Sequence, residues 1–507
     1  MKTTFCFFFL FFFFSSLTLM AATKYVSPSG SDANSGDSWA DAWLTLQHAA
    51  DEVEAGDSVW VADGNYAGFD LRTTGTAVDP IVFIAVSTGC IIDTDNPVTT
   101  DGINVENADY IEINGFRVVD QPRNGIRLVN AHFCIVRNTY CDNNFERGIF
   151  TGFTDDILIE YNECLNSIDE HGIYVSNSSD RSIIRYNSCH HNTRGGIQIN
   201  ADASQGGDGI STDPQIYGNV IYENGSGGGA AINLDGVQGA FIFNNLLYEN
   251  HATGIALFQQ DGAEPSLNGV IIHNTILNAS DGRWCILAVN GSSGAQVFNN
   301  IIINQHPWRG SIALDADAIP GFDSDYNLLV NSLSNDGDGQ SMSLSEWQML
   351  GYDLNSMLAD PLGDIFVSHG TGDFHLATDA QAINTGSAAH AYGIAEDIEM
   401  ITRPQGPEHD MGAYEAESAL AIDEEEEYTL LDAHTSSIRI GQTKITWSKK
   451  VKGTLLIFST DGKLIEQIDI EGPGQYSFEG LIPGVYVATL LTYPRLQWSK
   501  VFAFFGM

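Results

Sequence analysis

Short apolar runs recur through the middle of the chain, with a step of mostly 23–26 residues. Within each run, apolar and polar residues alternate, which is the period of a β-strand that buries one face. A small residue followed by Ile opens each unit, at Gly102-Ile103, Gly125-Ile126, Gly148-Ile149, Gly172-Ile173, Gly196-Ile197, Ala231-Ile232, Gly254-Ile255, Cys285-Ile286 and Ser311-Ile312. Repeats of this length made of short strands are typical of solenoids with stacked coils. The pattern therefore predicts an all-β chain dominated by a parallel β-solenoid.

A second column of the repeat carries Asn, at Asn114, Asn138, Asn162, Asn187, Asn219, Asn245, Asn274, Asn300 and Asn327. Two residues further on stand Phe116, Tyr140, Cys164, Cys189, Ile221, Leu247, Ile276, Ile302 and Leu329. Stacked coils place equivalent residues above one another, so we expect an Asn hydrogen-bond ladder in a turn and a core column beside it. A leucine-rich repeat has a similar period, but the L-x-x-L-x-L spacing is absent.

The two ends of the repeat region predict caps and a second domain. Trp43, Leu46, Ala50 and Val53 fit one face of a short helix that would cover the first coil. The β-helix with its cap and closing segment is expected over 22–416, and an acidic linker over 417–435. Alternating strands with turns follow, which predicts a small β-sandwich over 436–507.

The first 21 residues have the composition of a secretory signal peptide. Lys2 precedes an apolar run, and Ala21 and Ala22 offer a cleavage site. An uncleaved membrane anchor is the alternative, although the run is short for a span. Signal cleavage predicts a secreted or cell-surface protein with six cysteines and no membrane span in the mature chain. Cys164 and Cys189, on adjacent coils, could form a disulfide or remain buried thiols.

Charge narrows the range of partners. The chain has 65 acidic and 22 basic residues, a net charge of −43, which excludes nucleic acid and an anionic membrane surface as partners. The acids are unevenly distributed, because residues 117–194 hold eight Arg against ten acids. Such a locally neutral stretch in an acidic protein leaves room for an anionic polymer at that place alone.

Polar side chains on the outward positions of successive coils predict an extended groove for a linear polysaccharide. The strand after each Gly-Ile pair alternates inward and outward, so its outward residues form columns across the coils. The residues expected to bind substrate there are Arg123, Arg127, Gln198, Asn200, Asn233 and Asp235. The alternative is a salt-bridged ladder of Arg and Glu on a solvated sheet.

Three segments resemble known families. Residues 24–36, KYVSPSGSDANSG, with AGDSVWV at 55–61, are similar to the N-terminal cap of secreted right-handed parallel β-helix proteins, including the alginate-lyase and chondroitinase-B family. Residues 397–415 resemble the closing segment of such proteins, and 438–504 a type IX secretion sorting domain. The resemblance implies a right-handed β-helix, a polysaccharide substrate, and export by the type IX machinery of a Bacteroidota-like bacterium.

The segment Asp169-Glu170-His171-Gly172-Ile173-Tyr174 carries the candidate catalytic groups. A polysaccharide lyase neutralises a uronate carboxylate, abstracts the C5 proton and protonates the leaving oxygen. We expect His171 as base, Tyr174 as acid, and Arg147 or Arg194 as the neutralising group. The segment distantly resembles the Asp-Pro-His-Glu motif of mannuronan C5-epimerases, through Asp169 and His171 only. The alginate-lyase family implies a Lys base, but the chain has no Lys between Lys24 and Lys444.

Two other functions remain open from the sequence. Asp202, Asp208 and Asp213, with Asp235 nearby, could support glycoside hydrolysis or bind Ca²⁺, although no EF-hand spacing is present. Otherwise no metal or cofactor is expected. A non-catalytic adhesin or glycan-binding solenoid would need only an aromatic-lined face. The expected function is an extracellular lyase acting as a monomer on a uronate-containing polysaccharide.

Overall fold

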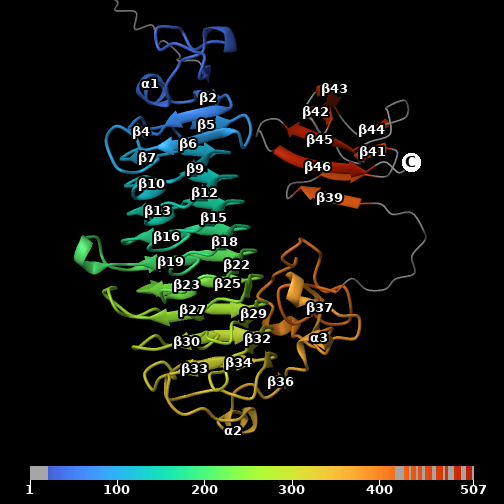
Figure 1. The fold of residues 1–507 in the computed structure, drawn as a ribbon. Helices are drawn as coiled ribbons and strands as arrows, with labels where there is room; N and C mark the ends of the chain where they lie inside the picture. The colour runs from blue at the N-terminus through green and yellow to red at the C-terminus, as the bar shows by residue number, and fades with distance from the viewer. Residues whose placement is uncertain are drawn as a thin grey trace, which may run out of the picture. The chain divides into compact units, whose positions relative to one another are not determined.

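The computed structural model describes residues 21–416 and the backbone of eight strands between 428 and 504. The chain divides into two compact units, Met1–Glu417 and Ser418–Met507. In the first unit, three parallel sheets wind around a common core as a right-handed β-helix (Figure 1). Each complete coil supplies one strand to sheet A, one to sheet B and one to sheet C, in that order along the chain. The predicted fold class is confirmed.

Sheet A contains β1 (Thr23–Val26), β2 (Ser58–Val61), β5 (Ile81–Ala85), β8 (Ile111–Asn114), β11 (Ile135–Arg137), β14 (Leu158–Glu160), β17 (Ile183–Arg185), β21 (Gln215–Tyr217), β25 (Phe241–Phe243), β28 (Val270–Ile272), β31 (Gln296–Phe298) and β34 (Asp323–Asp325). Sheet B contains β3 (Gly64–Ala67), β6 (Cys90–Thr94), β9 (Arg117–Val119), β12 (Tyr140–Asp142), β15 (Glu163–Leu165), β18 (Ser188–His190), β22 (Val220–Tyr222), β26 (Leu246–Tyr248), β29 (Thr275–Asn278), β32 (Ile301–Asn304), β35 (Leu328–Leu329) and β36 (Met357–Leu358). Sheet C contains β4 (Phe69–Leu71), β7 (Ile103–Glu106), β10 (Asn124–Val129), β13 (Arg147–Gly152), β16 (Ile173–Ser176), β19 (Ile197–Asn200), β23 (Ala230–Asp235), β27 (Thr253–Phe258), β30 (Ile286–Ala288) and β33 (Ile312–Leu314).

The remaining elements of this unit are small. Two short strand pairs join β20 (Ser211–Thr212) to β24 (Val237–Gln238), and β37 (Phe366–Ser368) to β38 (Asp373–Leu376). The helices are α1 (Leu46–Glu52), α2 (Leu344–Met349) and α3 (Leu362–Ile365), with single 3₁₀ turns η1 (Trp39–Asp41), η2 (Ala203–Gln205), η3 (His369–Thr371) and η4 (Ala388–His390). No helix within the described residues is both long and apolar enough to cross a membrane.

The repeat register in sheet C follows the small residue–Ile pairs. Ile126 lies beside Ile149, Ile149 beside Ile173, and Ile173 beside Ile197. These side chains are fully buried, so they form one aliphatic column through the core. Since side chains alternate along a strand, the residue after each Ile points to the outer face of sheet C. The predicted outward column is confirmed from Arg127 to Ala256.

The Asn ladder is confirmed from the fifth coil onward and starts later than predicted. The side-chain amide of each Asn donates to the next Asn oxygen at 2.9–3.1 Å, through Asn162, Asn187, Asn219, Asn245, Asn274, Asn300 and Asn327. Asn138 is outside this ladder, because it occupies the left-handed turn position with φ 55° and pairs with Asn114. Thr139 takes the ladder place by donating to Asn162. Consequently Cys141, not Tyr140, lies in the core column.

A second Asn ladder, which the sequence analysis missed, fixes the turns between sheets B and C. Asn192 donates to Asn224, and Asn224 to Asn250, at 2.9 and 3.1 Å. The Asn192 oxygen also accepts from the backbone N–H of Ser167 in the preceding coil. Buried amides that satisfy one another in this way hold a turn rigidly. The turns between sheets B and C therefore form a stable support for side chains that project from them.

The caps and cysteines match part of the prediction. Helix α1 buries Leu46, Ala49 and Ala50 over the first coil, and Trp43 and Val53 are also buried. In the closing segment, Arg403 and Glu415 form a fully buried ion pair at 2.8 Å. All six cysteines of the described part are buried free thiols, so Cys164 and Cys189 form no disulfide. Hydrogen bonds to Cys141 and Cys189, together with burial, raise the pKa of the Cys164 thiol.

The second unit contains two four-stranded antiparallel sheets. One comprises β39 (Tyr428–Asp432), β40 (Ser436–Ile440), β41 (Lys444–Trp447) and β44 (Gly474–Ser477). The other comprises β42 (Lys452–Ser459), β43 (Leu464–Glu471), β45 (Val485–Thr492) and β46 (Trp498–Phe504). This arrangement agrees with the expected sandwich, but its first strand begins at Tyr428, inside the range predicted as linker. Residues 1–20 of the predicted signal peptide lie outside the described residues, so that prediction is not tested.

Candidate functional site

A groove of about 470 Å³ lies on the outer face of sheet C, along the strands from β16 to β30. Its floor comes from outward side chains of the strands, and one wall comes from turns between sheets B and C. The other wall comes from loops that lead from sheet C back to sheet A. Its polar lining includes Arg147, Glu170, His171, Tyr174, Arg194, Gln198, Asn200, Asn233, Asp235, Asp261 and Arg283.

The structure gathers most of the predicted site residues in this groove. The four predicted catalytic residues line it, and so do Gln198, Asn200, Asn233 and Asp235. Arg123 and Arg127 do not line it: Arg123 pairs with the buried Asp101, and Arg127 with Glu106. Their guanidinium groups thus form structural ion pairs, as expected for the salt-bridged ladder that was the alternative to a substrate groove. The chemical roles of the residues that do line the groove remain predictions. Their contacts indicate which roles each side chain can fill.

Tyr174, Asn200 and Asp261 form a connected set at the groove. The Asn200 amide nitrogen donates to the Tyr174 hydroxyl oxygen at 3.1 Å and to an Asp261 carboxylate oxygen at 3.2 Å. Burial raises the pKa of Tyr174, so its phenol stays protonated at neutral pH. The Asn200 nitrogen therefore holds the Tyr174 hydroxyl, a proton donor, close to the Asp261 carboxylate.

His171 is held as a neutral imidazole, which is unfavourable for its predicted role as base. Its Nδ1 accepts the backbone N–H of Gly195 at 2.9 Å, which places the ring proton on Nε2. Burial, followed by the charges of Arg147 and Arg194, lowers the pKa of His171 to about 3. An imidazole with one nitrogen accepting and the other protonated can only donate to a ligand. The geometry thus makes His171 a hydrogen-bond donor rather than a proton acceptor.

Arg147 is already neutralised by the protein. Its guanidinium contacts carboxylate oxygens of Glu146 and Glu170, each at 2.6 Å. It also lies 5.0 Å from the ring centre of Phe150 and 4.7 Å from that of Tyr174. The two carboxylates compensate the charge of Arg147, and the two rings fix its guanidinium on the floor of the groove. Of the two predicted neutralising residues, Arg147 is therefore the less suited to bind a substrate carboxylate.

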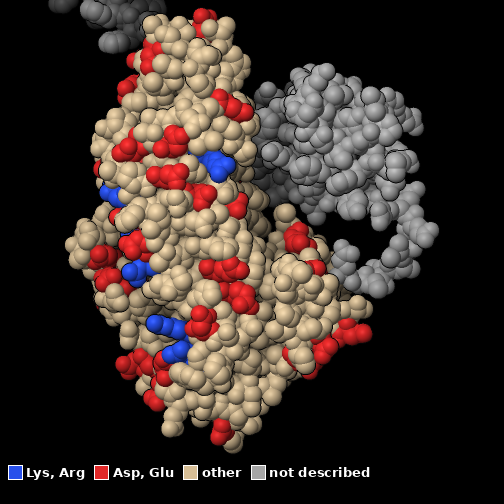
Figure 2. All heavy atoms as spheres, in the orientation of Figure 1, with Lys and Arg blue, Asp and Glu red and all other residues tan. Residues whose placement is uncertain are grey.

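Arg194 and Arg283 are the cations of the groove that form no ion pair with a carboxylate. Within residues 21–416, every Lys and Arg other than Arg117, Arg194 and Arg283 forms an ion pair with a carboxylate. Arg194 and Arg283 are exposed, and Arg194 donates only to the Asp169 carbonyl oxygen, at 3.2 Å. Figure 2 shows how common carboxylates and how rare basic groups are on the face it draws. Two unpaired arginines in one groove of so acidic a protein indicate a site for an anion.

Asp235 supports the groove instead of taking part in its chemistry. Its two carboxylate oxygens accept the backbone N–H groups of Gln260, Asp261 and Gly262 at 2.8–3.2 Å. Burial raises the pKa of Asp235, and these three donors oppose that effect. The contacts fold the loop after β27 back over the strand, which is how Asp261 comes to the groove.

Asp261 and Arg283 were not identified from the sequence. Asp261 is in a loop insertion, outside the repeat columns. Arg283 stands two residues before Cys285-Ile286, so it continues the column of Arg123 and Arg194 and could have been found from that column. The predicted loop carboxylates behave differently: Asp202 and Asp208 accept backbone N–H groups of Ser204 and Ile210 within their own turns. Residues 21–416 contain no group of three His, Cys, Asp or Glu arranged to hold a metal ion.

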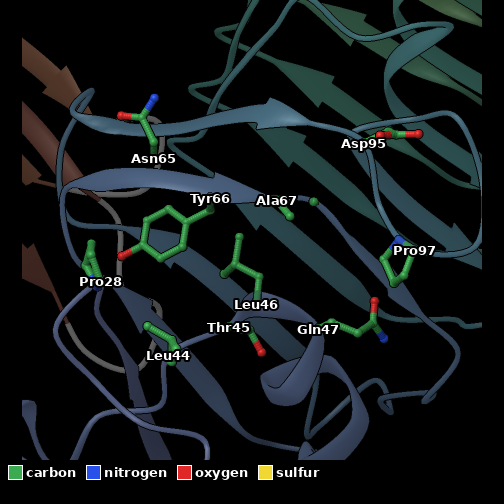
Figure 3. Close-up of a pocket in the computed structure, with 11 residues that line it drawn as sticks. Pro28, Leu44, Thr45, Leu46, Gln47, Asn65, Tyr66, Ala67, Asp95 and Pro97 are labelled. Atoms are coloured by element: carbon green, nitrogen blue, oxygen red, sulfur yellow. The ribbon is translucent and has the colours of Figure 1, made fainter.

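A second hollow, of about 550 Å³, lies at the N-terminal cap between α1 and β3 (Figure 3). Its lining is mainly apolar and includes Pro28, Leu44 and Pro97. Asp95 is the carboxylate in its lining, and the Tyr66 hydroxyl is used in a hydrogen bond to the Ala62 carbonyl oxygen. This hollow brings no acid–base pair together, so the groove on sheet C is the better candidate for chemistry.

Comparisons with known proteins agree with this fold. The profile of a family described as "Pel9A-like, right handed beta helix region" matches residues 24–170. The solved structure of pectate lyase Pel9A has 16% identity and a TM-score of 0.51, covering 78% of this chain and 97% of the other. A rhamnogalacturonan lyase has 15% identity and a TM-score of 0.39, covering 61% of this chain and 82% of the other. An alginate lyase from Paenibacillus sp. str. FPU-7 has 18% identity and a TM-score of 0.37, covering 57% and 97%.

A search of curated proteins found no match. The class that fold and site define is thus a right-handed parallel β-helix protein with a polar groove on sheet C.

Proposed function

We propose that the protein is a polysaccharide lyase that cleaves a uronate-containing polymer by β-elimination in the groove on sheet C. The observation that carries the proposal is one groove that holds both the neutral phenol of Tyr174 and two arginines without an ion pair, Arg194 and Arg283. A uronate polymer offers a carboxylate for such an arginine, and an acidic proton next to that carboxylate. The similarity to pectate lyase Pel9A in fold supports a polysaccharide-acting enzyme.

The proposed reaction begins with a uronate carboxylate bound by Arg194. Pairing that carboxylate with a cation stabilises the negative charge that develops when C5 loses its proton. The Asp261 carboxylate takes this proton, the C4=C5 double bond forms, and the bond between C4 and the glycosidic oxygen breaks. The Tyr174 hydroxyl gives its proton to the departing oxygen. Proton exchange with water then restores both groups, and no water is consumed.

The remaining groove residues bind and orient. The Nε2–H group of His171 is suited to donate to a carboxylate or hydroxyl oxygen of the sugar. Asn233 donates to Gln198 at 2.6 Å, which fixes both amides on the floor. The Asn200 side-chain oxygen is buried and has no hydrogen-bond partner among the described residues, so the role of Asn200 is carried by its amide nitrogen. In this scheme Asn200 also keeps Asp261 and Tyr174 at the same sugar.

Glycoside hydrolysis is less well supported. It requires two carboxyl groups that are free to act as acid and base or nucleophile. The oxygens of Asp235 are occupied by three backbone N–H groups, and Glu170 is paired with Arg147. Asp261 is then left without an evident partner carboxyl in the groove lining.

The test is incubation of the purified protein with a panel of uronate polymers, following the absorbance of the unsaturated product. We expect product on at least one polymer, and its loss in the Tyr174→Phe variant. New reducing ends without absorbance would instead indicate hydrolysis. Retention of a polymer with neither signal would indicate a glycan-binding protein.

We infer that the protein acts outside the cell, on the basis of residues 1–21 and the sorting-domain resemblance of residues 438–504. Fractionation of the producing cells tests this inference. Protein in the medium or on the cell surface, lacking residues 1–21, is the expected result.

A further inference from the structure

An exposed tryptophan lies one coil beyond Arg283. Trp308 is in the turn before β33, and Arg283 is in the corresponding turn before β30, the neighbouring strand of sheet C. Its side chain is 44% exposed, a fraction matched among the described tryptophans only by Trp39, at 47%. A large apolar ring exposed beside a polar groove is typical of a binding surface.

The Trp308 ring is held in place by its neighbours. The Arg309 guanidinium lies 4.4 Å from the ring centre, and His306 and Trp284 meet the ring edge-on at 5.2 and 6.4 Å. Asp338 in turn fixes this set, by accepting two hydrogen bonds from Arg309 and one from the Trp284 indole, all at 2.8 Å. The ring is therefore ordered before any ligand arrives, which reduces the entropy cost of binding.

The charge around Trp308 differs from that around Arg194. Arg309 is compensated by Asp338, so the turn presents an aromatic surface and no free cation. Such a surface suits the C–H face of a sugar ring. From β19 to β33 there are four coil steps, which amount to about 19 Å along the helix axis at the strand spacing of a sheet. That distance corresponds to several sugar residues of an extended polymer.

We infer that Trp308 is a sugar-stacking subsite, and that the polymer runs along the helix axis from Arg194 past Arg283 to Trp308. This inference rests on the proposed function, because it extends the same groove. It makes the protein specific for long chains, since a short oligosaccharide at Arg194 cannot reach Trp308. It also predicts cleavage within chains rather than from one end.

The experiment compares Trp308→Ala with Trp39→Ala on a long uronate polymer and on its trisaccharide. Trp39 is a matched control, because it is similarly exposed but packs at a tilt against Tyr25 at the N-terminal cap. We expect Trp308→Ala to lower kcat/KM on the polymer about tenfold, within the range of an aromatic contact, and to leave the trisaccharide unchanged. Trp308→Phe should recover part of the loss, and Trp39→Ala should match the wild type.

Equal losses on polymer and trisaccharide, or no loss on either, would overturn the subsite. Binding is measured separately by retardation of the Tyr174→Phe protein in gels that contain each polymer. Retardation that Trp308→Ala weakens, together with no unsaturated product from the protein that retains Tyr174, would preserve the subsite and reject the lyase. Equal retardation with and without Trp308→Ala, together with lyase activity in the protein that retains Tyr174, would reject only the subsite.

Discussion

The chemistry of the groove depends on which side chains are already satisfied by the protein. Arg147 and Arg194 are similar in sequence context, yet the first contacts two carboxylates and the second contacts none. His171 is likewise committed, because Gly195 occupies Nδ1. Two of these partners, Glu170 and Gly195, come from the neighbouring coil. Contacts between coils thus separate residues of the same type into structural and ligand-binding roles.

Tyr174→Phe tests the proposed acid. Loss of the hydroxyl removes the proton donor to the leaving oxygen, and we expect kcat to fall by about 10²–10⁴-fold, the usual range for general acid–base catalysis. The phenyl ring keeps its contact with Arg147, so the melting temperature should change little. The absorbance assay and thermal unfolding measure the two effects. Near wild-type turnover would show that another group protonates the leaving oxygen.

His171 should make the stability of the protein depend on pH. Its pKa is lowered from 6.5 to about 3, so between these values the unfolded chain binds more protons than the folded chain. The free energy of unfolding should therefore be highest above pH 6.5 and fall as the pH drops toward 3. Denaturant titrations at several pH values should show a weaker decline in His171→Gln than in wild type. Parallel declines in the two proteins would contradict the buried, neutral state of His171.

At the scale of elements, the turns are as regular as the strands. The Asn ladder runs through consecutive turns between sheets A and B, and a second ladder supports the turns between sheets B and C. Each rung satisfies buried backbone groups that a turn would otherwise leave unpaired. Sequence periodicity alone could place the first ladder, but it misplaced Asn138, because either of two adjacent positions can carry the polar residue.

Asn219→Ala tests the ladder. The side chain is fully buried and bonded on both sides, so its loss leaves several buried polar groups unsatisfied. We expect a loss of about 3 kcal/mol in the free energy of unfolding, measured by denaturant titration. Asn138→Gly is the control, because Asn138 is exposed and glycine tolerates its positive φ. A similar loss in both variants would show that a ladder Asn stabilises the fold no more than an exposed turn Asn does.

The whole molecule combines a strongly negative chain with a small cationic site. A net charge of −43 repels an anionic polymer in general, so binding must depend on the few arginines that form no ion pair with a carboxylate. In the described β-helix these are Arg194 and Arg283 in the groove, and Arg117, which lies 4.8 Å from the ring centre of Tyr140. The positive charges of Arg194 and Arg283 therefore distinguish the groove from the acidic surface around it.

The double variant Arg194→Gln, Arg283→Gln should lose affinity for uronate polymers at least tenfold, because two charge-assisted contacts disappear. Arg181→Gln is the control, since Arg181 is exposed but paired with Asp156 at 2.8 Å. Gel retardation across a range of salt concentrations should show a weaker salt dependence for the double variant. An equal loss in Arg181→Gln would indicate a general charge effect.

The sequence determined the coils, their register and the outward columns of sheet C. A small residue before a buried Ile and an Asn in the turn are local requirements that each coil repeats, so they can be read without a structure. Tertiary structure alone decided which charges are free. Arg147 pairs with Glu170 one coil away, whereas Arg194 and Arg283, which share a repeat column, form no ion pair, and Asp261 comes from the loop after β27. Ion pairing depends on side-chain conformation and loop folding on the inserted residues, and the repeat encodes neither.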